Sequence, residues 1–163
     1  MIKVKKAKTR GDKTLIYAVA IAIALGLAFA GMNSKLLSSN DVMGYDSLIE
    51  KLTSSGAEVK PLGDVEAPFF FVAGKEISVN GNDVQIFEHP DAAATDAKAK
   101  LISEDGLFIG TQTSEGMDLS AVEWGGTPHF YKKGKLIVIY IGDDRKTKDV
   151  LTAALGAQFA GGK

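Results

Sequence analysis

The chain has 163 residues, of which 45% are hydrophobic, and it carries a formal net charge of -1 with no cysteine. This length suits one compact domain, and the missing thiols exclude disulfides, thiolate metal sites, iron–sulfur clusters and a cysteine nucleophile. Six of the 19 basic residues and one of the 20 acidic residues lie in residues 1–13, which leaves 13 basic and 19 acidic residues, a net charge of -6, from Thr14 onward. An acidic body of this kind argues against nucleic-acid binding.

The first 31 residues have the pattern of a membrane-targeting segment. Residues 1–13 form a basic leader, and residues 14–31, TLIYAVAIAIALGLAFAG, contain no charged side chain. As a helix this run would measure roughly 27 Å, close to the hydrocarbon thickness of a bilayer. The basic flank predicts a cytoplasmic N-terminus and a C-terminal part outside the membrane. We therefore expect a single-pass anchor; the alternatives are a signal cleaved near Ala30, giving a secreted protein, and a buried core helix.

The chain after the apolar run predicts a tether followed by a folded domain. Residues 32–44 are polar and serine-rich, so we place the domain at residues 45–163. Helical spacing in YDSLIEKLTSSG predicts a helix that ends near Gly56. Extended patterns follow: AEVKPLG as an edge strand, PFFFV as a buried strand or the entry to one, and EISV and NDVQIFEH as a hairpin around Asn80-Gly81.

The second half predicts a helix over about 91–102, a strand in GLFIGTQT, a loop in TSEGMDLSAVEWGG, and a hairpin whose arms are TPHFY and LIVIYIG around a KKGK turn. Asp143 or Asp144 is expected to cap a last helix that ends at Gly156. Hairpins joined by helices without regular alternation favour antiparallel pairing. We expect an α+β fold, with one antiparallel sheet of about five or six strands and about three helices packed on one face.

A search for catalytic patterns finds two isolated candidates. The chain lacks the glycine-rich phosphate loops, the H-E-x-x-H zinc motif, the G-x-S-x-G elbow and the S-x-x-K pair. His89 and His129 are the only histidines, each next to a proline. They are candidates for a metal site or a general base, provided that carboxylates converge on them. The structural alternatives are a half-buried imidazole hydrogen-bonded at the rim of the sheet and an exposed imidazole. No cofactor is expected.

Candidate contacts to a ligand or partner lie in and just before the C-terminal hairpin. Trp124 is the only tryptophan and precedes two glycines, so it is either a binding residue at the mouth of a groove or an anchor of the core. Lys132, Lys133 and Lys135 cluster at the hairpin tip. They are candidates for contact with anionic groups, although lysines at such a tip also keep it soluble and discourage edge pairing.

The segment from about Tyr45 to Gly161 resembles a type of small exported bacterial domain found as uncharacterised lipoprotein-like or membrane-anchored proteins. The resemblance rests on SLIEKLTSSGAEV, VNGNDVQIFEHPDAA, TPHFYKKGKLIVIYIGDD and LGAQFAG. It implies an address in the cell envelope and no particular activity. Met32 stands where a lipoprotein would carry its lipidated cysteine, so this chain would depend on its apolar helix for anchorage.

These observations lead to three expectations for function. The first is a non-enzymatic domain, tethered to the membrane and displayed outside it, that binds a protein partner or a small ligand. The second is a metal-dependent or acid–base enzyme that uses His89 and His129. The third is an accessory subunit whose helix packs against a larger membrane complex. The small residues that would allow close approach are Ala24, Gly26, Ala28 and Ala30.

Overall fold

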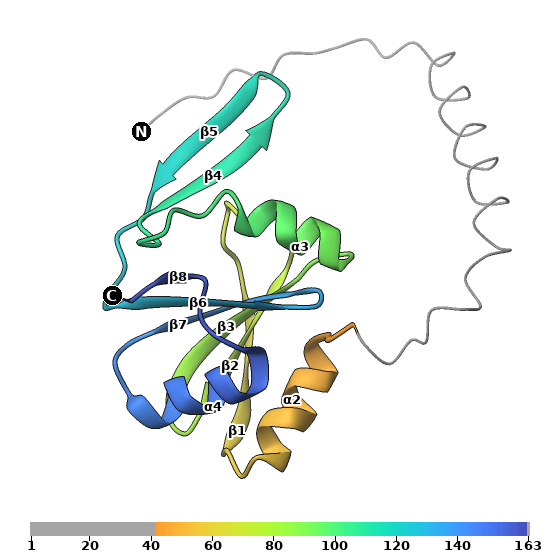
Figure 1. Cartoon of the computed structure of the whole chain (residues 1–163), viewed down its shortest axis with the longest axis vertical. Helices are drawn as coiled ribbons and strands as arrows, with labels where there is room; N and C mark the ends of the chain where they lie inside the picture. The colour runs from red at the N-terminus through yellow and green to blue at the C-terminus, as the bar shows by residue number, and fades with distance from the viewer. Residues whose placement is uncertain (1–41, 163) are drawn as a thin grey trace, which may run out of the picture. The chain divides into compact units, whose positions relative to one another are not determined.

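A computed structural model describes residues 42–162 (Figure 1). The leader of residues 1–13, the expected anchor at residues 14–31 and most of the tether lie outside the described residues. No helix within residues 42–162 is long and apolar enough to cross a membrane. The described elements, in chain order, are α2 (Tyr45–Ser54), β1 (Val59–Val65), β2 (Gly74–Val79), β3 (Asn82–Glu88), α3 (Ala92–Ala99), β4 (Phe108–Thr113), β5 (Gly116–Ala121), β6 (Pro128–Lys133), β7 (Leu136–Ile141), α4 (Arg145–Leu155) and β8 (Ala160–Gly161).

The described residues confirm the α+β prediction, with a main antiparallel sheet in the order β1-β2-β3-β7-β6-β8. Asn80-Gly81 forms the expected turn between β2 and β3, and both residues have positive φ. This conformation suits the asparagine–glycine pair of a two-residue hairpin. β1 is the expected edge strand, with a bulge between Pro61 and Gly63. The C-terminal hairpin is also as predicted, although Lys132 and Lys133 belong to β6 and the turn is centred on Gly134.

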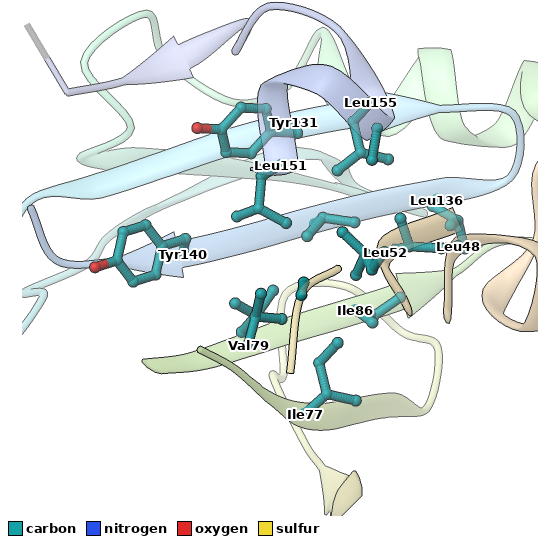
Figure 2. Close-up of a cluster of buried hydrophobic side chains, with 14 residues drawn as sticks. Leu48, Leu52, Ile77, Val79, Ile86, Tyr131, Leu136, Tyr140, Leu151 and Leu155 are labelled. Carbon is teal, nitrogen blue, oxygen red and sulfur yellow. The ribbon is translucent and has the colours of Figure 1, made fainter. Parts of the chain in front are cut away.

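One face of the sheet packs against α2 and α4, and we call this layer the first core. Leu48 and Leu52 from α2 and Leu151 and Leu155 from α4 are buried against β2, β3, β6 and β7. Figure 2 shows these leucines converging on the sheet side chains, among them Ile86. Buried apolar side chains at i, i+3 and i+4 are what fix such a helix onto a sheet.

The opposite face is also covered, so the expectation that helices pack on one face is wrong. α3 and the 66–73 segment lie over this second core, which contains Phe70, Phe87, Ala99 and Phe130; Figure 1 shows α3 on the far side of the sheet from α2 and α4. The physical reason lies in β7, LIVIYI, whose successive residues are nearly all buried. A strand that is apolar on both faces needs cover on both.

The sequence pattern predicted a strand or strand entry at PFFFV, and this prediction is wrong. The segment is a set of turns that closes over the second core. Phe70 donates its backbone N–H to Ala67 O and stacks on Phe87 with ring centroids 4.2 Å apart. Phe71 has φ of 55° and is 76% exposed. Because β1 and β2 are antiparallel neighbours, this segment reverses the chain and cannot continue the strand.

The stretch predicted as a loop after Thr113 is a strand. β5 pairs with β4 in a separate two-stranded hairpin, from Phe108↔Ala121 to Thr113↔Gly116. Figure 1 shows this hairpin extending beyond the layers of the sheet. α3 is shorter than the expected 91–102: Asp91 caps it through Ala94 N, and Ile102 forms a β-bridge to Ile109. Asp144, rather than Asp143, caps α4 by accepting from Thr147 N.

Candidate interaction surface

His89 and His129 lie at opposite ends and on opposite faces of the sheet. The His89 N–H donates to Lys135 O, beside the start of β7, whereas His129 pairs with Tyr140 near the end of β7. The interval between those two points along an antiparallel strand is roughly 17 Å. His89 meets Phe70 of the second core edge-on, and His129 stacks on Tyr140 of the first. The structure does not bring the two imidazoles together.

His89 is a buried imidazole in apolar surroundings. It is 6% exposed, and within residues 42–162 its Nε2 has no hydrogen-bond partner. Burial lowers the pKa of His89, and the positive charge of Lys98 lowers it further. The neutral imidazole is therefore favoured, in a position more buried than the hydrogen-bonded site at the sheet rim that we considered for this residue. In the described part of the chain, no group of three or more histidine, aspartate or glutamate side chains is placed to hold a metal ion.

His129 ties the C-terminal segment to β6. Gln158 donates from Nε2 to the carbonyl oxygens of Gly161 and Gly162, which leaves its Oε1 as an acceptor. His129 Nδ1 lies 2.6 Å from that oxygen and therefore donates to it. Its Nε2 is buried without a partner among the described residues. The contacts of His129 thus fix the position of residues 158–162.

Trp124 is half-buried and anchors the second core. Its indole Nε1–H donates to Gly106 O over 2.8 Å, and its ring meets Phe69 and Phe130 edge-on. These contacts hold the turn before β4 against the sheet. Trp124 thus has the anchoring contacts that we considered for it, and a role in binding stays a prediction.

The three tip lysines are each engaged with a neighbouring element. Lys132 pairs with Asp96 on α3, Lys133 donates to Ala154 O at the end of α4, and Lys135 pairs with Glu88 on β3. The tip of the β6–β7 hairpin is thereby tied to helices on both faces. Met43, at the end of the expected tether, also contacts this tip, because its carbonyl oxygen accepts from Lys135 N.

The β4–β5 hairpin carries an open apolar surface that was not among the candidate sites expected from the sequence. Directly opposed residues of an antiparallel pair point to the same side, so the register places one row of side chains together. We call this row the hairpin face: Phe108, Gly110, Gln112, Met117, Leu119 and Ala121. Met117 is 60% exposed and Leu119 63%. The missed signal was the alternation of Met117, Leu119 and Ala121 with Asp118 and Ser120.

The base of the hairpin is held by α3 and the residues after it. Gly110 donates its N–H to Leu101 O, and its carbonyl oxygen accepts from the ammonium of Lys98 over 2.7 Å. Lys98 is buried, and burial lowers its pKa. Beside this contact, Ala97, Lys98, Leu101, Gln112 and Phe71 line a hollow of about 330 Å³. An isolated two-stranded hairpin is marginally stable in water, so these contacts position it.

Phe71 extends this apolar surface beyond the hairpin face. Its positive φ is unfavourable for a bulky residue and costs of order 1 kcal/mol or more. That strained backbone turns the ring outward, where it forms one wall of the hollow that Gln112 also lines. Strained backbone conformations of this kind cluster at binding and active sites.

The sequence that forms the hairpin and its flanks carries charge of a single sign, although Lys98 of α3 contacts Gly110 at the base of the hairpin. No lysine or arginine occurs between Leu101 and Tyr131, whereas Glu104, Asp105, Glu115, Asp118 and Glu123 do. Asp118 lies within β5 and points to the side opposite the hairpin face, because it alternates with Met117 and Leu119. The hairpin therefore offers apolar side chains in an acidic setting.

In comparisons with known proteins, no protein-family model, no curated protein and no solved structure matches the chain. The candidate site therefore rests on the geometry described above.

Proposed function

We propose that this chain is a membrane-anchored domain displayed outside the cytoplasmic membrane, and that it acts as a non-enzymatic protein-binding module through its β4–β5 hairpin. The proposed address is supported by the sequence of residues 14–31, which is long and apolar enough to span a bilayer, and by the basic residues before it. The resemblance to exported bacterial domains supports the same compartment.

The observation that carries the binding role is the exposure of the hairpin face. Met117 and Leu119 are each more than half exposed and lie on one side of the hairpin together with Phe108, which is 42% exposed. Contiguous apolar surface of this kind on a soluble domain marks an interaction site. A hairpin that stands clear of the main sheet is accessible to a protein of any size.

The partner can also contact the anchor, which would make the chain an accessory subunit of a membrane complex. The small residues Ala24, Gly26, Ala28 and Ala30 support this form of the proposal, because they allow two helices to approach closely. A partner that co-purifies with the full chain from gently solubilised membranes, but not after deletion of residues 1–31, would support contact through the anchor.

Site-specific photo-crosslinking in intact cells tests the binding role. A photoreactive residue placed at Leu119 is expected to give a discrete adduct of higher mass. The matched control is Leu62 on the edge strand β1, which is 51% exposed and lies away from the hairpin face. Absence of an adduct at Leu119, or equal adducts at both positions, would contradict the proposal.

A further inference from the structure

The outer edge of β5 is an open position for another strand. In the part of the chain that the structure describes, β5 pairs with β4 and with no other strand. The edge strands of the main sheet are protected in comparison. β1 carries Lys60, Pro61 and a bulge, and β8 has only two residues; lysine, proline, bulges and shortness all discourage strand addition.

The hydrogen bonds of β4 show which backbone groups of β5 face that edge. Phe108 accepts from Ser103 N through its carbonyl oxygen, and Gly110 donates to Leu101 O, so both turn their backbone polar groups away from β5. Opposed residues in an antiparallel pair either bond to each other or both turn outward. Ala121 and Leu119, the partners of Phe108 and Gly110, therefore direct their N–H and C=O groups to the open edge. Met117 does the same, two residues further along.

The same three residues supply the apolar side chains. Met117, Leu119 and Ala121 belong to the hairpin face, while Asp118 and Ser120 point to the opposite side. A strand added to this edge would place every second side chain beside Met117 and Leu119. Its intervening side chains would lie on the side of Asp118. The side chains beside Met117 and Leu119 therefore have to be apolar. The side chains that lie on the side of Asp118 are best matched by a positive charge.

We infer that the β5 edge binds an extended segment of a partner protein in which apolar residues alternate with lysine or arginine. This inference rests on the proposed binding role of the hairpin and names the chemistry of the partner. Charge selects this occupant over a second copy of the chain, because two hairpins that meet would bring together Glu115, Asp118 and Glu123 of each without any basic residue. Backbone hydrogen bonds supply affinity in such a mode, and alternate side chains supply specificity.

Peptide binding to the full chain tests the inference. The chain is held in nanodiscs of phosphatidylcholine, a lipid without net charge, and the probe is a labelled heptapeptide that alternates valine and lysine. It is expected to bind at least about tenfold more tightly than a peptide that alternates valine and glutamate, or than one with the same valines and lysines in two blocks. Equal binding of the three peptides would overturn the inference.

Two changes test strand pairing, and the second of them separates it from contact with side chains alone. Leu119→Pro removes the outward N–H of Leu119 and is expected to weaken binding about tenfold or more, whereas Leu62→Pro, at the bulge of β1, leaves it unchanged. Methylation of the peptide backbone at all valines, or at all lysines, blocks one edge of the peptide and leaves the protein intact. One of the two methylated peptides is expected to lose binding and the other to keep it. Loss in both, or in neither, would overturn strand pairing.

The outcome is distinct from that of the crosslinking experiment. A strong adduct at Leu119 in cells, with no preference for the alternating peptide, would leave the binding role intact and overturn the inference about the partner. A dimer of the full chain in detergent that Leu119→Pro dissociates would assign the β5 edge to a second copy, which would also overturn it.

Discussion

At the scale of single residues, the buried imidazole of His89 predicts a pH dependence of stability. Its pKa lies below the ordinary value of 6.5 because burial and the charge of Lys98 disfavour the cation. The unfolded chain therefore takes up this proton at a higher pH than the folded chain does. The contribution of neutral His89 to stability is fully present above about pH 6.5. It is lost as the pH falls from there toward the lower pKa of the folded state.

We expect the free energy of unfolding to decrease between about pH 7.5 and pH 5.5, and His89→Phe to remove most of that decrease. Denaturation of the full chain in mild detergent, followed by the fluorescence of its single tryptophan, measures it. Asp96, Asp105 and Asp144 do not interfere, because hydrogen bonds hold their pKa values below 3.8. An unchanged slope in His89→Phe would contradict this account of His89.

Sequence alone indicated the chemistry of these residues better than their placement. The sequence suggested two roles each for Trp124 and for the histidines. The spacing of the histidines did not reveal that His89, just after β3, and His129, in β6, lie on opposite faces of the sheet. That depends on which strands are neighbours and on register, and a shift of one residue would reverse the face. The contact of Lys98 with Gly110 joins α3 to β4 across a turn and has no counterpart in any local pattern.

At the scale of elements, the ammonium of Lys98 holds the β4–β5 hairpin to α3. Lys98→Met keeps a long unbranched side chain but removes the bond to Gly110 O, a hydrogen bond from a charged donor that contributes about 1.5–3 kcal/mol. Burial lowers the pKa of Lys98, so its charged form is a cost to the folded state at neutral pH. We therefore expect global stability to change little, because the lost bond and the relieved desolvation oppose each other.

Lys98→Met is expected to affect the local stability of the β4–β5 hairpin more than the global stability of the domain. Amide hydrogen exchange in β4 and β5 should accelerate about tenfold or more in Lys98→Met, with no change in β3 and β7. Lys100→Met, at the exposed end of the same helix, serves as the control. Uniform acceleration throughout the sheet, or none in the hairpin, would contradict a specific role of Lys98 in holding it.

Elements with strong local signals were predictable, and those defined by tertiary contacts were not. The β2–β3 turn at Asn80-Gly81, the break of β1 at Pro61 and the end of α4 at Gly156 follow from backbone preferences of single residues. The turns at Phe69–Phe71 do not, because three adjacent phenylalanines read as a strand until Phe70 is seen stacked on Phe87. β5 was missed because its sequence, GMDLSA, contains no β-branched or aromatic residue, the types that favour strands.

At the scale of the whole molecule, both faces of the main sheet are covered by other elements, whereas the β4–β5 hairpin is available to bind a partner. α2 and α4 cover the first core, and α3 with the 66–73 segment covers the second. β1 and β8 close the sheet edges with little pairing capacity. Among the described residues, β5 combines exposed apolar side chains with an unpaired strand edge, which suits the proposed role of holding a partner beside a membrane.

The central claim is that this hairpin stands outside the cytoplasmic membrane. The chain contains no cysteine, so Ser114→Cys in the turn between β4 and β5 would provide its single thiol. A small sulfonated maleimide that does not cross the cytoplasmic membrane is expected to label this thiol in intact cells as fully as after lysis. Labelling that appears only after lysis would place the domain in the cytoplasm and contradict the account.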